Sequence, residues 1–268
     1  MKIETVLQTD GIDKTDLEVF LKEVIDVDRS WILAHPEYEL PENHEKQMNE
    51  WIARRGQGEP VAYIIGKKEF YGREFQVDSS VLIPRPATEG LIDEVLGLGL
   101  GLGKSSPNPS PSPKVVDTKV VILTRLFGDI SDVKTIVDIG TGSGCVAITL
   151  KLELPDFEVV ATDVSEDAIR VAKKNAEKHQ AEIDFRSGDL LDPIKNLDQP
   201  FIIVSNPPYI PQSEELMRDV RDYEPERALF GGGEEGTEVL ARLMQGARNH
   251  SHCGGVVMEC RDTQVSRL

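Results

Sequence analysis

Residues 135–144 read TIVDIGTGSG, an apolar run that passes directly into a glycine-rich turn. The run has the length and composition of a buried parallel strand, and residues 145–154 behind the turn are a helix candidate. Glycines in such a turn let the backbone approach a ligand closely. The spacing is GxGxG rather than GxGxxG, and no Gly-Lys-Ser/Thr follows, which argues against nicotinamide-dinucleotide and Walker-type phosphate sites. An ordinary tight connection is the alternative interpretation.

Three more predicted strands follow, each with a polar residue at its end. The strand at 158–163 ends in Asp163, about 20 residues beyond the glycines, where an acid commonly holds ribose hydroxyls. A charge at the start of the next helix is the alternative role for this residue. The other two candidates are Asp189, after the strand at 182–187, and Asn206, after the strand at 201–205. Because ligands bind at the carboxyl edge of an open α/β sheet, the sequence predicts a Rossmann-like nucleoside-binding domain.

The tetrapeptide Asn206-Pro207-Pro208-Tyr209 combines hydrogen-bond acceptors with an aromatic plane. An amide or aromatic NH2 group is a poor nucleophile, because its lone pair is delocalised. The Asn206 side-chain oxygen and the Pro207 carbonyl could each accept one N–H bond and so aim that lone pair at an electrophile. The two prolines stiffen the loop, and Tyr209 offers a stacking face. The pattern therefore indicates methylation of a planar nitrogen; a strand-ending turn above a packed aromatic ring is the alternative.

These motifs, with three others, resemble the HemK/PrmC family of protein-(glutamine-N5) methyltransferases, which modify peptide chain release factors. The matching segments are DIGTGSG at 138–144, NPPY at 206–209, EPVAYIIGKKEFYGREFQV at 59–77, IPRPATE at 83–89 and YEPERALFGG at 223–232. The last segment is more typical of this family than of methyltransferases at large.

The resemblance implies a transfer of methyl from S-adenosylmethionine to the side-chain nitrogen of the glutamine in a Gly-Gly-Gln loop. It assigns cofactor binding to Gly140, Thr141, Gly142, Ser143, Gly144, Asp163, Asp189, Leu190 and Asn206. It assigns substrate binding to Asn206, Pro207, Pro208 and Tyr209, of which Asn206, Pro207 and Tyr209 are the catalytic candidates. No metal is implied. Positioning and electrostatics supply most of the rate in such a reaction.

We expect three regions. Residues 1–68 form a helical substrate-recognition domain that grips the release factor, and residues 69–130 form a hairpin linker with a low-complexity insert at 97–113. Residues 131–268 form the S-adenosylmethionine-dependent methyltransferase domain. Arg85, between two prolines, is either a contact on the catalytic face or a salt-bridged linker residue. A run of acids is typical of a solvated surface, with partner binding as the alternative: Glu214, Glu215, Asp219, Asp222, Glu224 and Glu226.

The carboxyl-terminal segment departs from the family pattern. The fifth predicted strand ends at Glu259 and nine residues follow it, whereas the family's sheet continues through a helix and two strands. We therefore expect a sheet that lacks its last antiparallel strands and exposes apolar surface, unless a neighbour or a partner chain covers it. A truncated, non-catalytic homologue is one alternative function.

Composition narrows the remaining possibilities. The formal charge of −17 and the absence of a basic cluster argue against a strong nucleic-acid binder. They weaken the other alternative, an adenine-N6 or guanine-N2 methyltransferase, without excluding it. No apolar run reaches the ~20 residues of a membrane span and no signal-peptide pattern is found, so we expect a cytoplasmic enzyme. The three cysteines lack metal or redox spacing and are expected to be reduced.

Overall fold

The computed structural model describes residues 1–99 and 120–268, which form two compact units. One unit comprises Met1–Lys67 with Leu216–Tyr223, and the other comprises Lys68–Glu215 with Glu224–Leu268. The predicted insert at 97–113 lies, from residue 100 onward, outside the described residues. Within the described ranges, no helix is both long and apolar enough to cross a membrane.

The first unit is helical. Its helices are α1 (Ile3–Val6), α2 (Lys14–Ile25), α3 (Arg29–Ala34), α4 (Glu42–Gly56), α5 (Val61–Ile65) and α9 (Arg218–Tyr223). The side chains of Asp13 and Asp28 cap α2 and α3, each accepting a backbone N–H at 2.7 Å. The apolar face of α2, which includes Phe20 and Leu21, packs with Met48 of α4 in a fully buried core. The helical region predicted at residues 1–68 therefore folds as a small bundle whose apolar helix faces pack together.

The second unit begins with a small hairpin and a helix. Strands β1 (Lys67–Phe70) and β2 (Arg73–Gln76) pair through a turn at Gly72, whose φ of 70° suits glycine. The single turn η1 (Pro86–Thr88) then leads into α6 (Glu89–Gly97). Phe70 and Phe75 of the hairpin are buried in the same apolar cluster as α6. This arrangement fixes the segment at 83–89 against the main sheet.

The main sheet has six strands in the order β3-β8-β7-β4-β5-β6. Their bounds are β3 (Val120–Leu126), β4 (Thr135–Ile139), β5 (Glu158–Asp163), β6 (Asp184–Ser187), β7 (Phe201–Ser205) and β8 (Cys253–Arg261). All neighbouring pairs are parallel except β3 with β8. The helices between the strands are α7 (Cys145–Glu153), α8 (Glu166–His179) and α10 (Glu238–Asn249), with short turns η2 (Asp192–Ile194), η3 (Glu226–Ala228) and η4 (Asp262–Arg267). The predicted Rossmann-like fold is confirmed.

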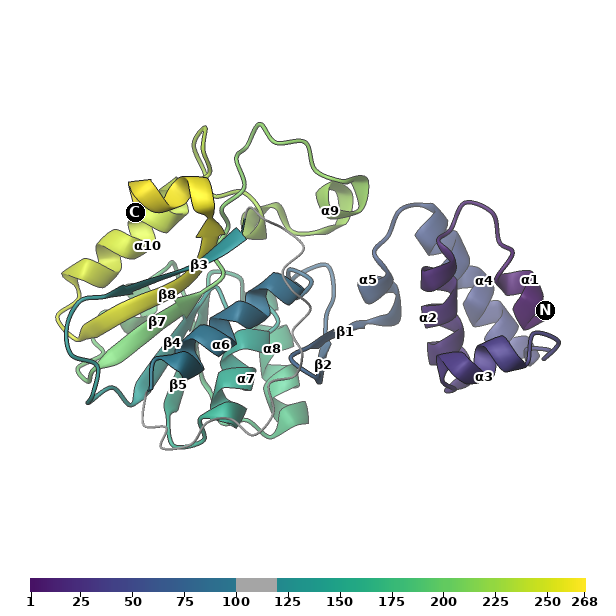
Figure 1. The fold of residues 1–268 in the computed structure, drawn as a ribbon, viewed down its shortest axis with the longest axis horizontal. Helices are drawn as coiled ribbons and strands as arrows, with labels where there is room; N and C mark the ends of the chain where they lie inside the picture. The colour runs from purple at the N-terminus through teal and green to yellow at the C-terminus, as the bar shows by residue number, and fades with distance from the viewer. Residues whose placement is uncertain (100–119) are drawn as a thin grey trace. The chain divides into compact units, whose positions relative to one another are not determined.

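Helices cover both faces of this sheet (Figure 1). Successive strand side chains point to opposite faces, so Ile136 packs in the cluster with α6, α7 and α8, whereas Val137 packs in the cluster with α10. The central strands β4 and β7 are buried at every position. This double burial explains why both strands are continuous apolar runs rather than alternating ones.

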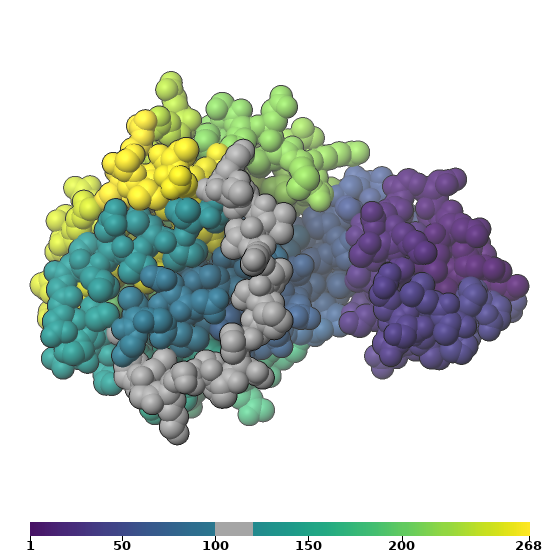
Figure 2. Space-filling model, in the orientation of Figure 1, coloured from purple at the N-terminus to yellow at the C-terminus, as the bar shows by residue number. Residues whose placement is uncertain are grey.

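Strand β3 occupies the antiparallel position beside β8. Its register runs from Val120 opposite Arg261 to Leu126 opposite Gly255. No strand follows β8 within residues 262–268, as expected, but the edge of β8 that we expected to be open is covered by residues assigned to the linker. Figure 2 shows the teal surface of β3 beside the yellow surface of the C-terminal segment. The unpaired backbone groups of β8 thus find their partners upstream in the chain rather than downstream.

Candidate active site

The glycine-rich turn joins β4 to α7 in a left-handed conformation. Gly140 and Gly144 have φ values of 74° and 81°, which strain residues that carry a Cβ. A Cβ at Gly144 would also lie 3.1 Å from the Cβ of Ala172, so this glycine lets α7 pack closely on α8. The backbone N–H groups of Gly140 and Thr141 donate to the Thr162 carbonyl at 2.8 and 2.9 Å. The turn is therefore fixed to the end of β5.

Asp138 is a buried acid at the end of β4. Its carboxylate accepts hydrogen bonds from the Thr141 hydroxyl at 2.6 Å and the Ala147 N–H at 3.2 Å. Burial raises the pKa of Asp138 to about 7, and the neighbouring Asp163 adds to the increase, while the two hydrogen bonds oppose it. A carboxyl group that titrates near neutrality at a cavity wall is a functional candidate. We did not single out this residue from the sequence.

Asp163 is the last residue of β5, and its side chain holds both the glycine-rich turn and the start of the segment that leads into α8. One of its carboxylate oxygens accepts the Gly142 N–H at 2.9 Å, and the other accepts the Ser165 N–H at 2.8 Å. Burial raises its pKa, whereas these backbone donors and Arg227 lower it. Each oxygen retains a second lone pair, so the carboxylate can hold the loops and still accept from a ligand.

The Asn-Pro-Pro-Tyr segment leaves the end of β7 next to the glycine turn. The Ser205 hydroxyl donates to the Ile139 carbonyl at 2.6 Å, which ties β7 to β4 at the edge where both loops begin. The Asn206 Nδ2 group donates to the Thr88 hydroxyl at 2.8 Å. The Tyr209 hydroxyl donates to Glu259 of β8 at 2.7 Å. Thr88 and Glu259 were not identified as site residues from the sequence.

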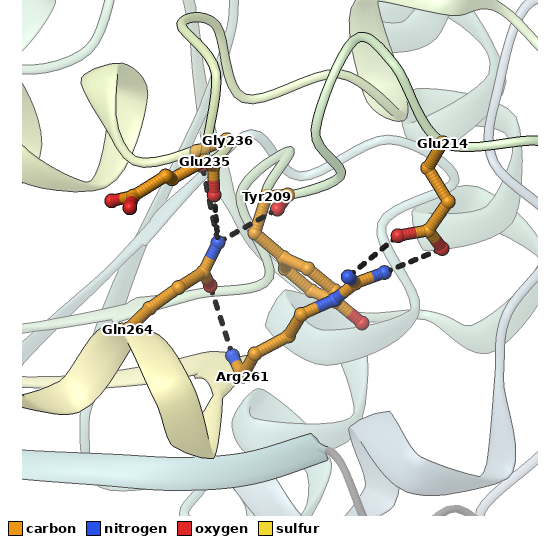
Figure 3. A network of polar contacts seen from close by, with 6 residues as sticks. All are labelled: Tyr209, Glu214, Glu235, Gly236, Arg261 and Gln264. Atoms are coloured by element: carbon orange, nitrogen blue, oxygen red, sulfur yellow. Dashed lines mark hydrogen bonds and ion pairs between the residues drawn. The ribbon is translucent and has the colours of Figure 1, made fainter.

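A second network of polar contacts holds the backbone of the Asn-Pro-Pro-Tyr loop at Tyr209 (Figure 3). Gln264, buried in η4, donates to the carbonyls of Tyr209 and Glu235 at 2.9 and 2.8 Å. Its side-chain oxygen accepts the Arg261 N–H at 3.0 Å, and the Arg261 guanidinium forms a two-point pair with Glu214. The residues after β8 therefore fix the carbonyl end of Tyr209, while Glu259 fixes its hydroxyl.

Arg85 combines both of the roles considered for it. It lines the cavity and also forms an ion pair with Glu224, whose side chain is 1% exposed. Glu224 additionally accepts the Ile83 N–H at 3.3 Å. Glu224 is thus an exception to the solvated surface predicted for the acidic run. It is buried because Arg85 and the Ile83 N–H compensate its charge.

Asp189 and Leu190 follow β6 and line the cavity. Asp189 forms an ion pair with Arg242 of α10. Leu190 has a φ of 44°, an uncommon conformation for a residue with a side chain. Strained positions of this kind cluster at ligand sites.

One cavity gathers nearly all the predicted site residues. From the predicted set it is lined by Gly140, Thr141, Gly142, Ser143, Asp163, Asp189, Leu190, Asn206, Pro207 and Pro208. Gly144 and Tyr209 are not among the lining residues; they act through packing and through the contacts described above. Thr88, Asp138, Arg227 and Arg242 line the cavity in addition.

Comparison with known proteins extends over both units. A family model described as "PrmC N-terminal domain" matches residues 2–66, and one described as "Methyltransferase small domain" matches residues 112–222. A release factor glutamine methyltransferase of Koribacter versatilis is 39% identical over 240 residues, covering 89% of this chain and 75% of that protein. Its counterpart in Bacillus cereus is 38% identical over 242 residues, covering 89% and 76%. A bifunctional methyltransferase of Rickettsia typhi is 36% identical over 270 residues, covering 96% of this chain and 49% of its own length.

Proposed function

The chain belongs to the release factor glutamine methyltransferase family, and from this premise we propose the specific reaction that its site performs. We infer that it transfers a methyl group from S-adenosylmethionine to the side-chain amide nitrogen, N5, of the glutamine in the Gly-Gly-Gln loop of a peptide chain release factor. The observation that supports this best is the shared cavity. The Asn-Pro-Pro loop and the glycine-rich turn line one space, so an amide and a methyl donor can meet there.

The cavity residues suit S-adenosylmethionine. The carboxylate of Asp163 has free lone pairs for hydroxyl groups, and the backbone of the glycine turn carries no Cβ that would block a close approach at Gly140 or Gly142. Leu190 provides an apolar surface for a planar base, and Asp138 is a carboxyl partner for a cationic group. When bound, the cofactor supplies an electrophilic methyl group.

The protein's own task is to prepare the amide nitrogen. Asn206 Oδ1 and the Pro207 carbonyl each accept one N–H of the substrate amide, which holds its plane and turns the nitrogen toward the donor. These acceptors also stabilise the positive charge that develops on nitrogen during transfer. Transfer leaves the amide nitrogen with a methyl group, two N–H bonds and a positive charge. This cation is acidic enough to lose one proton to water, which gives the neutral N-methyl amide, so no strong base is needed. Prolines at 207 and 208 keep the loop rigid because φ is fixed at both.

We assign recognition of the release factor to the helical unit at the N-terminus, which the family model for PrmC N-terminal domains matches. A rigid helical surface can bind the body of a protein substrate while the loop enters the cavity. The intact factor should then have a much lower KM than a short peptide that carries Gly-Gly-Gln. Equal KM values for the two would remove this role from the helical unit.

The reaction is tested by transfer of labelled methyl from S-adenosylmethionine. The acceptors are a purified release factor, its variant with the loop glutamine replaced by alanine, and a pool of RNA and DNA. Label on the intact factor alone supports the proposal. Label on nucleic acid would reassign the chain to amino-group methylation of bases, and label on the alanine variant would show that the loop glutamine is not the target.

A further inference from the structure

A relay of three polar side chains runs from the cavity into the sheet. Asn206 Nδ2 donates to Thr88 Oγ1 at 2.8 Å, and Thr88 Oγ1 donates to Glu259 Oε2 at 2.8 Å. The three residues come from the end of β7, from η1 and from β8. Thr88 is 3% exposed and Glu259 is 1% exposed, so water does not compete for these hydrogen bonds.

The relay has a fixed direction because both oxygens of Glu259 act as acceptors, one from the Thr88 hydroxyl and the other from the Tyr209 hydroxyl. A threonine hydroxyl has a single proton to donate. The Thr88 proton therefore goes to Glu259, and the side of the hydroxyl that faces Asn206 presents a lone pair. Only the NH2 end of the Asn206 amide can meet that lone pair. Among the described residues, Oδ1 of Asn206 has no hydrogen-bond partner, so it is the end available in the cavity.

Glu259 is held at both oxygens. Its Oε1 accepts the Tyr209 hydroxyl at 2.7 Å, so the two residues that bracket the Pro-Pro pair are connected to one carboxylate, Tyr209 directly and Asn206 through Thr88. Burial raises the pKa of Glu259, while the Tyr209 and Thr88 hydroxyls and the charge of Arg85 lower it. Cys260 is the neighbouring titratable group on its own strand. These donors compensate a carboxylate that is otherwise costly to bury.

We propose that Thr88 and Glu259 are positioning residues that set which end of the Asn206 amide faces the substrate. The inference rests on the proposed function, since it concerns the acceptor that receives the glutamine N–H. The two ends of an asparagine amide are nearly equal in size, so packing alone does not distinguish them. With the amide reversed, Asn206 would present its NH2 group to a substrate amide that itself needs to donate N–H hydrogen bonds. The relay excludes that arrangement.

The sharpest test is Glu259→Gln, which keeps the shape of the side chain and removes its acceptor-only character. With its oxygen toward Tyr209, the glutamine NH2 faces Thr88, whose proton must then point to Asn206 and favour the reversed amide. We expect kcat to fall at least tenfold, with the affinity for S-adenosylmethionine within threefold of wild type. A fall in kcat without loss of cofactor binding separates positioning from misfolding.

Thr88 supplies the complementary variants. Thr88→Val removes the acceptor for Asn206 and should lower kcat at least tenfold, whereas Thr88→Ser keeps the hydroxyl and should restore kcat to within about threefold. The double variant Thr88→Val with Glu259→Gln should have a kcat no lower than that of the more impaired single variant, because both substitutions remove the same constraint on Asn206. The matched control is Thr124→Val, which breaks an exposed threonine–glutamate bond of 2.7 Å to Glu94 in the same unit and should leave kcat unchanged.

A measurement without catalysis reads the amide directly. The side-chain NH2 signals of Asn206, identified in a 15N-labelled protein by their loss in Asn206→Asp, should show one proton protected from exchange in wild type. That protection should disappear in Glu259→Gln and Thr88→Val. Full turnover in Glu259→Gln, or equal impairment by Thr88→Ser and Thr88→Val, would overturn the inference. If wild type transfers no methyl to any release factor, the proposed function fails instead, and unchanged NH2 protection across the variants would overturn the relay independently.

Discussion

Asp138→Asn should remove a pH-dependent cost from the folded protein. Burial moves the pKa of Asp138 from 3.8 to about 7. At about 1.4 kcal/mol per pKa unit, ionising this carboxyl in the folded state costs roughly 4 kcal/mol. Asparagine has the shape of the protonated carboxyl and carries no charge, so the variant should not bear that cost.

The direction of the effect follows from where the proton is held more tightly. Because the folded protein retains the Asp138 proton to a higher pH than the unfolded chain, its contribution to stability is complete below about pH 4. The contribution is lost as the pH rises to about 7 and changes little above that. Between pH 5 and pH 8, the stability of Asp138→Asn relative to wild type should therefore rise by roughly 2.5 kcal/mol.

Urea unfolding at pH 5, 6, 7 and 8 measures this difference. Circular dichroism is the suitable signal, because both tryptophans, Trp31 and Trp51, lie in the helical unit and do not report on the sheet. At each pH, the free energy of unfolding of the variant is subtracted from that of wild type. This difference cancels the contributions of the other titrating groups to first order. A difference that stays constant from pH 5 to pH 8 would show that the pKa of Asp138 is not raised.

Three further changes test the site. Asn206→Ala should lower methyl transfer at least 100-fold while calorimetry finds cofactor affinity within about tenfold, because the side chain acts on the amide; retained turnover would exclude its role. Asp163→Ala should do the reverse and weaken cofactor binding more than tenfold, because it removes the brace on Gly142; an unchanged dissociation constant would contradict this. Arg85→Ala should lower the free energy of unfolding by about 2–3 kcal/mol, since it leaves Glu224 buried and unpaired. Adding Glu224→Gln should recover part of that loss in urea denaturation, and no recovery would refute the pairing argument.

Local sequence was sufficient to predict which residues lie at the carboxyl edge of the sheet, where the cavity is. The glycine turn, Asp163 and the Asn-Pro-Pro-Tyr loop are each specified by a few consecutive residues, and all lie at the carboxyl ends of parallel strands. Since that edge is shared, placing the strands also brings most of the predicted residues to one cavity.

What the sequence did not reveal depends on contacts between distant residues. Glu224 lies in a run of acids typical of a solvated surface, and its burial depends on Arg85, 139 positions away, together with the Ile83 N–H. Thr88 and Glu259 are 171 positions apart, and nothing in either local pattern points to the other. Strand β3 is apolar enough to form a strand, but its partner is chosen by the edge that β8 leaves unpaired.

The pairing of β3 with β8 has a consequence for the order of folding. It joins Val120 to Arg261, so the first strand of the sheet is paired last, after the ribosome has released every residue between them. We expect the parallel strands β4 to β7 to assemble earlier, with the antiparallel edge closing as a late and slow step, because contacts of long sequence separation form slowly. Before that step, the edge of β8 that faces β3 is unpaired, and we expect the chain to be most prone to aggregate in this interval.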